Sequence, residues 1–370
     1  MANRKQVVFC TDGIFPHAVG GMQRHSALLI EELARMNEMD LIVIHQHPAK
    51  VFPSHLNITE IPLNYQPGKG NYLLECYRYS KKVMEAVEKY PDAVIYSQGL
   101  SVWHNISKVG HRVIVNPHGL EPFQTIDLIN YLKTAPLRMA FRYIYKRAAK
   151  IVSLGGKLTP ILQSIAGKEK VVVLPNAVTI DKFPDRNYSG EHMNLLFVGR
   201  FAGNKGIHIL MKAVEDLNKE GYLKRLHFQL AGKGPLYEEY IKKYNFPNVT
   251  FHGFTSDEKL KELYLENDAF VFPTLYEGMP TVVLEAMAAG MPVIVSDTGA
   301  TAELVDHSNG FLIEKNNVRA LKCAVQGLYQ MTPQQRAQLS ANSFERVKKQ
   351  FTWPVVAQMH TQLFNTFRAG

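Results

Sequence analysis

The chain has 370 residues, of which 46% are hydrophobic and 20% are charged, and its formal net charge is +9. This length and composition are typical of a globular protein of two domains. Its three cysteines are scattered, without CxxC spacing, which argues against a disulfide framework. The N-terminus lacks the apolar run of a signal peptide, and no stretch approaches the roughly 18 apolar residues of a membrane-spanning helix. We therefore expect a cytoplasmic protein.

The positive charge is concentrated in the first half of the chain. Residues 1–185 contain 22 Lys and Arg against 15 Asp and Glu, whereas residues 186–370 contain 20 against 18. A basic first half favours an anionic partner, which could be a nucleic acid, an anionic lipid or a phosphorylated substrate.

Strand and helix patterns alternate through the first half. Short apolar runs predict strands at 6–11, 41–45, 93–97, 113–116, 150–154 and 171–174. Helical spacing of apolar residues predicts helices that include 22–36, 72–89 and 136–149. Strands that alternate with helices indicate a parallel, doubly wound sheet.

A polar segment at 175–193, broken by Pro175, Pro184 and Gly190, is interpreted as a linker. A second α/β alternation follows, with strands near 194–199, 226–231, 249–251, 269–272 and 293–296 and helices near 206–219, 235–244, 257–266, 280–289, 334–350 and 353–367. We predict two Rossmann-like domains, residues 1–180 and 181–350, followed by a terminal helix within 351–370. Ligands of such sheets bind at the carboxyl ends of the strands, so we expect a site in a cleft between the domains.

The loop 12–21 follows the first strand and ends in Gly20-Gly21 before a helix. Glycines let backbone N–H groups approach a phosphate, and the helix N-terminus adds the positive end of its dipole. The loop lacks GxGxxG spacing, so the dinucleotide-cofactor fingerprint is absent. An ordinary strand-to-helix turn explains these glycines equally well.

His118-Gly119 comes directly after the strand predicted at 113–116. A histidine there could hydrogen-bond a substrate hydroxyl or phosphate, although a solvent-facing loop histidine is the commoner meaning of one such residue. The 14 histidines show neither HExxH nor Cys/His ligand spacing, so no zinc site is expected.

Arg200 and Lys205 lie in one loop, FVGRFAGNKG, after the first strand of the second domain. A guanidinium and an ammonium in one strand-to-helix loop can bind a diphosphate. Gly203 and Gly206 favour this interpretation over a solvated basic turn.

The segment EGMPTVVLEAMAAGMPV places Glu277 and Glu285 eight residues apart. Pro280 suits the first helical position and Gly290 the far end, which predicts a helix over 280–289. The amides near Met279 then lie between two carboxylates, beside the positive end of the helix dipole. Acceptor, donor and acceptor groups in this order match the sugar, diphosphate and ribose of a sugar nucleotide. The alternative is a plain helix with one exposed glutamate.

On these motifs the chain resembles, over almost its whole length, the retaining GT-B glycosyltransferases of family 4. The motifs that carry the resemblance are Gly20-Gly21, His118-Gly119, Pro175-Asn176, Gly199-Arg200, Lys205-Gly206, Gly232-Lys233-Gly234-Pro235, His252-Gly253-Phe254, Glu277 to Glu285, and Phe351-Thr352-Trp353. The resemblance implies a nucleotide-sugar donor, with a UDP-sugar favoured over a GDP-sugar, and a retaining transfer without a metal ion or other cofactor. The implied acceptor is a cell-envelope glycan or lipid-linked glycan of the lipopolysaccharide, capsule or exopolysaccharide type.

The resemblance also implies a role for each matching residue. Arg200 and Lys205 would hold the departing diphosphate, His118 and Glu277 would contact the transferred sugar, and Glu285 would bind the ribose. Further donor contacts would come from Gly20, Gly21, Gly119, Lys233, Gly234, Phe254, Gly278, Met279, Pro280 and Thr281. The chain departs from the family pattern at Ala177, where Gly is usual, and at Ser97-Gln98-Gly99, where the family often has a His.

A basic segment, residues 132–150, carries six Lys and Arg, no acid, and three interleaved aromatic residues. Residues 72–89 also combine basic and aromatic side chains. Such helices favour an anionic membrane surface, so peripheral binding at the inner face of the cell membrane is expected, with a solvated charged face as the alternative.

Three other functions are compatible with parts of the pattern. A non-catalytic nucleotide-sugar-binding subunit would keep the same fold, but the complete set of Arg, Lys and Glu residues argues against it. A nicotinamide-dependent oxidoreductase is disfavoured by the missing GxGxxG. Nucleic-acid binding would explain the charge, but no nucleic-acid-binding motif supports it.

Overall fold

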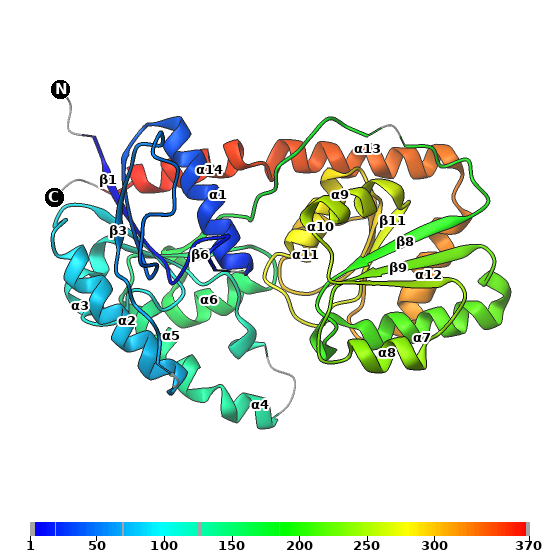
Figure 1. The fold of residues 1–370 in the computed structure, drawn as a ribbon, viewed down its shortest axis with the longest axis horizontal. Helices are drawn as coiled ribbons and strands as arrows, with labels where there is room; N and C mark the ends of the chain where they lie inside the picture. Colours follow the sequence, from blue (N-terminus) through cyan, green and yellow to red (C-terminus); the bar gives the residue numbers. More distant parts are fainter. Residues whose placement is uncertain (1–3, 19, 69, 125–127, 185, 368–370) are drawn as a thin grey trace. The chain divides into compact units, whose positions relative to one another are not determined.

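The computed structural model describes residues 4–18, 20–68, 70–124, 128–184 and 186–367. The chain divides into two compact units (Figure 1): unit 1 comprises residues 1–176 and 353–370, and unit 2 comprises residues 177–352. The sequence placed these boundaries at 180/181 and 350/351. In this division the terminal helix belongs to unit 1.

Unit 1 is built on a parallel sheet whose strand order, within the described residues, is β3-β2-β1-β4-β5-β6-β7. The strands are β1 (Gln6–Cys10), β2 (Asp40–His45), β3 (Ile58–Pro62), β4 (Val94–Gln98), β5 (Val113–Asn116), β6 (Lys150–Ser153) and β7 (Val171–Val173). The central strands are buried on both faces, which explains why they read as continuous apolar runs.

Helices cover this sheet. They are α1 (Gly21–Met36), α2 (Tyr72–Val87), α3 (Ile106–Val109), α4 (Leu128–Lys133), α5 (Ala135–Arg147), α6 (Leu158–Ala166) and α14 (Trp353–Asn365). Helix α14 packs beside α1 although more than 300 residues separate them in the sequence. Its Phe364 stacks edge-on against Phe9 and Tyr96 of the sheet, so the end of the chain completes the core of unit 1.

Unit 2 has a second parallel sheet, of order β10-β9-β8-β11-β12-β13 within the described residues. Its strands are β8 (Met193–Val198), β9 (Leu226–Ala231), β10 (Val249–Gly253), β11 (Ala269–Phe272), β12 (Val293–Ser296) and β13 (Gly310–Ile313). Phe197, Phe228, Phe270 and Phe272 are fully buried and form the centre of its core.

The helices of unit 2 are α7 (Ile207–Leu217), α8 (Tyr237–Lys243), α9 (Asp257–Glu266), α10 (Thr281–Ala288), α11 (Thr301–Leu304), α12 (Val318–Gln330) and α13 (Pro333–Gln350). Helix α7 packs on α12, and α10 packs on α13, on opposite faces of the sheet (Figure 1). A complete capping box between Thr332 and Gln335 starts α13.

The prediction of two doubly wound parallel sheets is confirmed. The edge strands β3 and β13 were not predicted, because each is short and only partly buried and therefore carries a weak apolar signal. Helix α12 was also missed, although its buried residues Leu321, Ala324, Val325 and Leu328 follow helical spacing. Pro280 caps α10 rather than occupying its first position. Within the described residues, no helix is both long and apolar enough to cross a membrane.

Candidate active site

The loops that follow the strands of unit 2 lie side by side at the carboxyl edge of its sheet. The backbone N–H of Phe201, after β8, donates to the carbonyl of Lys233, after β9, at 3.1 Å. The N–H of Gly232 in turn donates to the carbonyl of Gly253, the last residue of β10, with a distance of 2.7 Å. These bonds bring the loop of Arg200 and the Lys233-Gly234 loop together, as parallel strands require.

Lys205 and Glu277 form an ion pair at this edge. Lys205 Nζ lies 2.5 Å from Glu277 Oε1, and the Thr274 hydroxyl donates to the same oxygen at 3.1 Å. The two charged side chains are only 25% and 12% exposed. The structure thus joins two predicted site residues that are 72 positions apart, and adds Thr274, which no motif indicated.

Gly206 explains how the lysine loop reaches this place. Its φ is +69°, and a Cβ atom there would lie 1.7 Å from the carbonyl oxygen of Pro273. Only glycine permits this backbone approach between the loop after β8 and the end of β11. The glycine that the sequence associated with a phosphate therefore has a structural role in positioning Lys205.

The N-terminus of α10 lies directly after Glu277. Gly278, Met279 and Pro280 are buried, and the carbonyl of Gly278 accepts a hydrogen bond from Ala300 at 2.8 Å. Helix α10 begins at Thr281, whose amide is among the first-turn donors that have no intrahelical acceptor. The positive end of the helix dipole therefore follows Glu277, the partner of Lys205, closely in the chain, and a helix N-terminus near a cation is an electrostatic setting that binds anions.

Glu285, on the second turn of α10, is oriented by a tyrosine of α9. The hydroxyl of Tyr264 lies 2.9 Å from Glu285 Oε2. Burial, and secondarily the Glu285 carboxylate, raise the pKa of Tyr264 well above its ordinary value, so the hydroxyl keeps its proton and donates it. Like Thr274, Tyr264 is a neighbour of a predicted site residue that the sequence did not indicate.

Arg186 supports the same two helices from their other ends. Its guanidinium donates to the carbonyls of Tyr264 and Asn267 near the end of α9, each at 2.5 Å, and of Ala289 after α10 at 2.7 Å. A cation at helix C-termini offsets the negative end of the dipole and satisfies carbonyls that the helix leaves unpaired. This residue of the predicted linker therefore helps to fix α10.

Three other predicted residues of unit 2 present exposed side chains at the sheet edge. Arg200 and Lys233 are exposed cations, and Phe254, after β10, is 81% exposed. An exposed aromatic ring at the edge of a sheet can stack on a planar ligand group such as a nucleobase.

The remaining predicted residues belong to unit 1. Gly20 caps α1 and Gly21 begins it, while Val19 of the same loop lies outside the described residues. A Cβ atom at Gly21 would meet no atom of the described residues outside its chain neighbours within 4 Å. This glycine is therefore not required by packing within the described part of the chain, and the open space above it suits the approach of a ligand.

His118 and Gly119 follow β5. His118 has a left-handed backbone with φ of 58°, and its ring packs edge-on at 4.9 Å from the ring of His25. Burial, and secondarily His360, lower the pKa of His118 to about 3. The imidazole is neutral at physiological pH and acts as a hydrogen-bonding group rather than as a cation.

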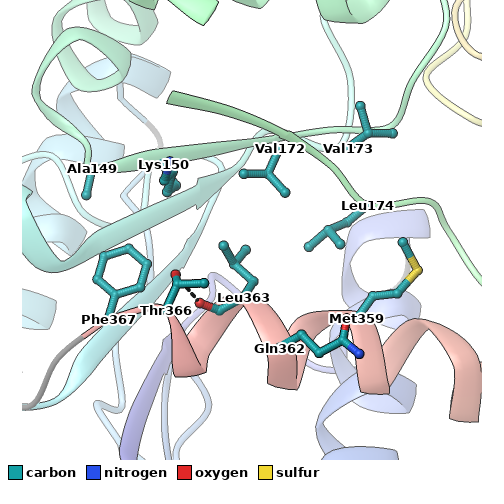
Figure 2. Close-up of a pocket in the computed structure, with 10 residues that line it drawn as sticks. All are labelled: Ala149, Lys150, Val172, Val173, Leu174, Met359, Gln362, Leu363, Thr366 and Phe367. Carbon is teal, nitrogen blue, oxygen red and sulfur yellow. Dashed lines mark hydrogen bonds between the residues drawn. The ribbon is translucent and has the colours of Figure 1, made fainter. Parts of the chain in front are cut away.

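Unit 1 also has an apolar groove of about 620 Å³ beside the edge strand β7 (Figure 2). Its lining includes Val172, Val173, Met359, Leu363 and Phe367, and none of the predicted site residues. Within the described residues, no cluster of three or more His, Cys, Asp or Glu side chains has the arrangement of a metal site.

Both units of the chain match models of known protein families. Residues 180–346 match the family model described as glycosyl transferases group 1, and residues 19–182 match the model of glycosyltransferase family 4. The chain belongs to the GT-B glycosyltransferases.

Curated relatives agree with this family assignment. The glycosyltransferase is 28% identical over 344 residues to an uncharacterized glycosyltransferase of Methanocaldococcus jannaschii, covering 90% of this chain and 91% of the relative. It is 29% identical to the capsular polysaccharide biosynthesis glycosyltransferase CapM of Staphylococcus aureus, over 56% of this chain and 58% of CapM.

Among solved structures, sucrose-phosphate synthase from Thermosynechococcus elongatus matches with a TM-score of 0.77 at 21% identity. The match covers 98% of this chain and 99% of the synthase chain. Anabaena HepE in complex with UDP-glucose has a TM-score of 0.69 at 16% identity, covering 98% and 99%. At these identities the two structures establish the fold.

Proposed function

We propose that this glycosyltransferase moves a sugar from a nucleotide diphosphate, with a UDP-sugar favoured over a GDP-sugar, to a cell-envelope glycan or lipid-linked glycan. The observation that carries the proposal is the adjacency of Lys205, Glu277 and the N-terminus of α10 at the carboxyl edge of one sheet. The complex of HepE with UDP-glucose supports the donor class, and the name of CapM supports a polysaccharide product.

Charge development in the reaction explains this set of residues. Breaking the bond between sugar and diphosphate leaves an oxocarbenium-like sugar and adds negative charge to the departing phosphate. In our proposal Lys205 and Arg200 stabilise that charge, together with the first amides of α10. Glu277 binds a hydroxyl of the transferred sugar, and Glu285, held by Tyr264, binds the ribose.

We further propose that the transfer retains the anomeric configuration and needs no metal ion. The resemblance to family 4 supports retention. In this proposal the exposed Arg200, the partly buried Lys205 and a helix N-terminus at one sheet edge supply the positive charge that a divalent ion provides in other transferases. On the resemblance alone, we also assign donor contacts to Gly20, Gly21, His118 and Gly119 of unit 1, to Lys233 and Gly234, and to Phe254 for the nucleobase.

A thermal-shift screen of UDP-sugars and GDP-sugars tests the donor class. A nucleotide present at 100 times its dissociation constant adds about 2.7 kcal/mol to the stability of the folded state. We expect stabilisation by one nucleotide series, followed by slow donor hydrolysis or sugar transfer. Stabilisation without either reaction would favour the non-catalytic subunit, and no stabilisation by any nucleotide sugar would refute the proposal.

We propose that helices α4 and α5 contact an anionic membrane that carries the acceptor. Met139 and Tyr143 of α5 are 70% and 40% exposed, and Ile129 and Leu132 of α4 are 65% and 62% exposed. The exposed cations Arg142, Lys146 and Arg147 lie on the same helix as the first two. Apolar and basic side chains exposed together are typical of membrane-surface helices.

Two members of the predicted basic and aromatic segment do not contribute to that surface. Arg138 is buried and donates to Thr134 Oγ1 at 2.6 Å and to the carbonyl of Pro122 at 3.1 Å. Tyr145 is fully buried. Both face the interior because they lie on the side of α5 that packs against unit 1, so the solvent-facing charge is smaller than the sequence suggested.

A further inference from the structure

The backbone of His118 lies in the left-handed region. A φ of 58° is uncommon for residues other than glycine and persists where surrounding contacts impose it. The contact here is a hydrogen bond from the His118 N–H to Oδ1 of Asn116, at 3.0 Å. Asn116 ends β5 and is only 1% exposed.

A chain of buried hydrogen bonds fixes the orientation of Asn116. His360 Nδ1 lies 2.8 Å from the carbonyl of Val356, which only accepts, so Nδ1 carries the ring proton. Burial lowers the pKa of His360 to about 4, so the ring is neutral and Nε2 must accept from the Tyr96 hydroxyl at 2.9 Å. Tyr96 therefore accepts from Asn116 Nδ2, also at 2.9 Å, which turns Asn116 Oδ1 toward His118. Each direction follows from the one before it.

A second buried amide faces the ring of His118. Oε1 of Gln98, at the end of β4, lies 2.6 Å from His118 Nε2 and 2.7 Å from the hydroxyl of Ser26. Gln98 is 1% exposed. In this orientation Gln98 turns its carbonyl oxygen, which only accepts hydrogen bonds, toward the ring, so His118 carries its proton on Nε2. The amide nitrogen of Gln98 is buried and has no hydrogen-bond partner among the described residues. A neutral imidazole has one N–H, which leaves Nδ1 as an acceptor.

We propose that Asn116 and Gln98 are positioning residues that hold His118 as a neutral Nε2–H imidazole, with Nδ1 accepting a hydrogen bond from a hydroxyl of the transferred sugar. Asn116 sets the backbone, and Gln98 sets the ring. The contact with the sugar rests on the proposed function, whereas the protonated atom is a property of the protein alone. The two can therefore fail independently.

The tautomer is measured by long-range ¹H–¹⁵N correlation on the full-length protein, with His118→Gln used to assign the signals. We expect one neutral tautomer with the proton on Nε2. A proton on Nδ1 would overturn the proposal. It would mean that Gln98 turns its NH₂ group toward the ring, while Ser26 donates to the Met22 carbonyl that lies 2.7 Å away.

Gln98→Met tests the consequence for the reaction, because Met fills a similar volume without a carbonyl. We expect both His118 tautomers to appear and kcat/KM for the preferred nucleotide sugar to fall about tenfold, while the dissociation constant of UDP, or of GDP if that is the donor nucleotide, stays within about twofold. If Gln98 had a purely structural role, Gln98→Met would weaken the binding of the free nucleotide as much as that of the nucleotide sugar. An unchanged kcat/KM would also refute the proposal.

Two further measurements separate the possible failures. Asn116→Ala should lower kcat/KM in the same way, again without loss of free-nucleotide binding, because the backbone of His118 loses its acceptor. Ser26→Ala removes the second partner of Gln98 but keeps the Gln98 carbonyl, so it controls for a general disturbance of this buried cluster and should keep the Nε2–H tautomer. If the wild-type protein bound no nucleotide sugar, the proposed function would fail while the tautomer result would stand.

Discussion

Lys205 Nζ lies 2.5 Å from Oε1 of Glu277, and the two residues come from loops after different strands, β8 and β11. In the proposed function the lysine binds the diphosphate and the glutamate binds the sugar attached to it. These groups are covalent neighbours in the donor, so the residues assigned to them must also be neighbours. The pair meets that requirement within unit 2.

Replacing the cations tests the assignment of the leaving group. Lys205→Ala or Arg200→Ala should lower kcat by about 10²–10³, which corresponds to ~3–4 kcal/mol of transition-state stabilisation. Steady-state sugar transfer measures the effect, and Lys212→Ala, an exposed lysine on α7, is the matched control. Near-normal activity in both variants would remove the assignment.

Lys205→Ala also removes the ion pair between Lys205 and Glu277, and this loss is expected to reduce stability. The double variant Lys205→Met/Glu277→Gln removes both charges and keeps similar volumes. It should unfold at a temperature close to that of the wild type and should remain inactive. Inactivity without unfolding separates the catalytic effect from the structural one.

Tyr264→Phe should weaken donor binding without abolishing the reaction. The substitution removes the hydrogen bond that orients Glu285, and a hydrogen bond to a charged group contributes about 1.5–3 kcal/mol. We expect the affinity for the nucleotide, measured by calorimetry, to fall about tenfold or more. Tyr240→Phe, in α8 of the same unit, should have no such effect. Equal affinities for the wild type and Tyr264→Phe would show that Glu285 does not depend on this tyrosine.

The local patterns in the sequence predicted the central parts of both sheets and the helix that starts after Glu277 and contains Glu285. A sequence predicts such a helix because its apolar residues recur with a fixed period, and because the proline and glycine that mark its two ends lie next to it in the chain. The sequence could not predict the contact between Tyr264 and Glu285. The two residues are 21 positions apart and meet only because α9 and α10 come together in the fold.

For the same reason, the sequence did not predict which residues surround His118. The sequence indicated the histidine from its position after a strand, but Asn116, Tyr96 and His360 meet only once β4, β5 and α14 are assembled. Gln98 was noted as a departure from the family pattern, and only the fold shows that it faces the ring of His118.

Unit 1 should lose stability on acidification. Burial lowers the pKa of His25, His118 and His360, to about 3 for His118 and about 4 for His360. The unfolded chain takes up protons on these residues near pH 6.5, whereas the folded chain does not, so stability rises with pH in this range. The contribution of these neutral histidines to the free energy of unfolding is fully present above about pH 6.5. At pH 5 the free energy of unfolding is lower by up to about 2 kcal/mol for each histidine.

Thermal unfolding at pH 5.0 and 7.5 measures this dependence. His25→Phe is the informative variant, because neither ring nitrogen of His25 has a hydrogen-bond partner in the described part of the chain. It should reduce the difference between the two pH values, whereas His55→Gln, at an exposed position, should not. A protein that is more stable at pH 5.0 would contradict the prediction.

Binding to vesicles tests the membrane surface. The wild type should bind vesicles that contain phosphatidylglycerol, and the binding should weaken with salt, because each basic side chain near the surface contributes about 1 kcal/mol. Arg142→Glu combined with Lys146→Glu should abolish binding at low salt, and Lys212→Glu in unit 2 should leave it intact. A wild-type protein that ignores anionic vesicles at low salt would refute the proposal.

The most direct test of the central claim is the calorimetric affinity for the diphosphate of the preferred donor, UDP or GDP, measured in excess EDTA for the wild type and for Lys205→Ala. We expect the wild type to bind equally well with and without EDTA, and Lys205→Ala to bind at least about tenfold more weakly. Loss of wild-type binding in EDTA, or equal binding by the two proteins, would contradict a diphosphate site built from Lys205 and the N-terminus of α10.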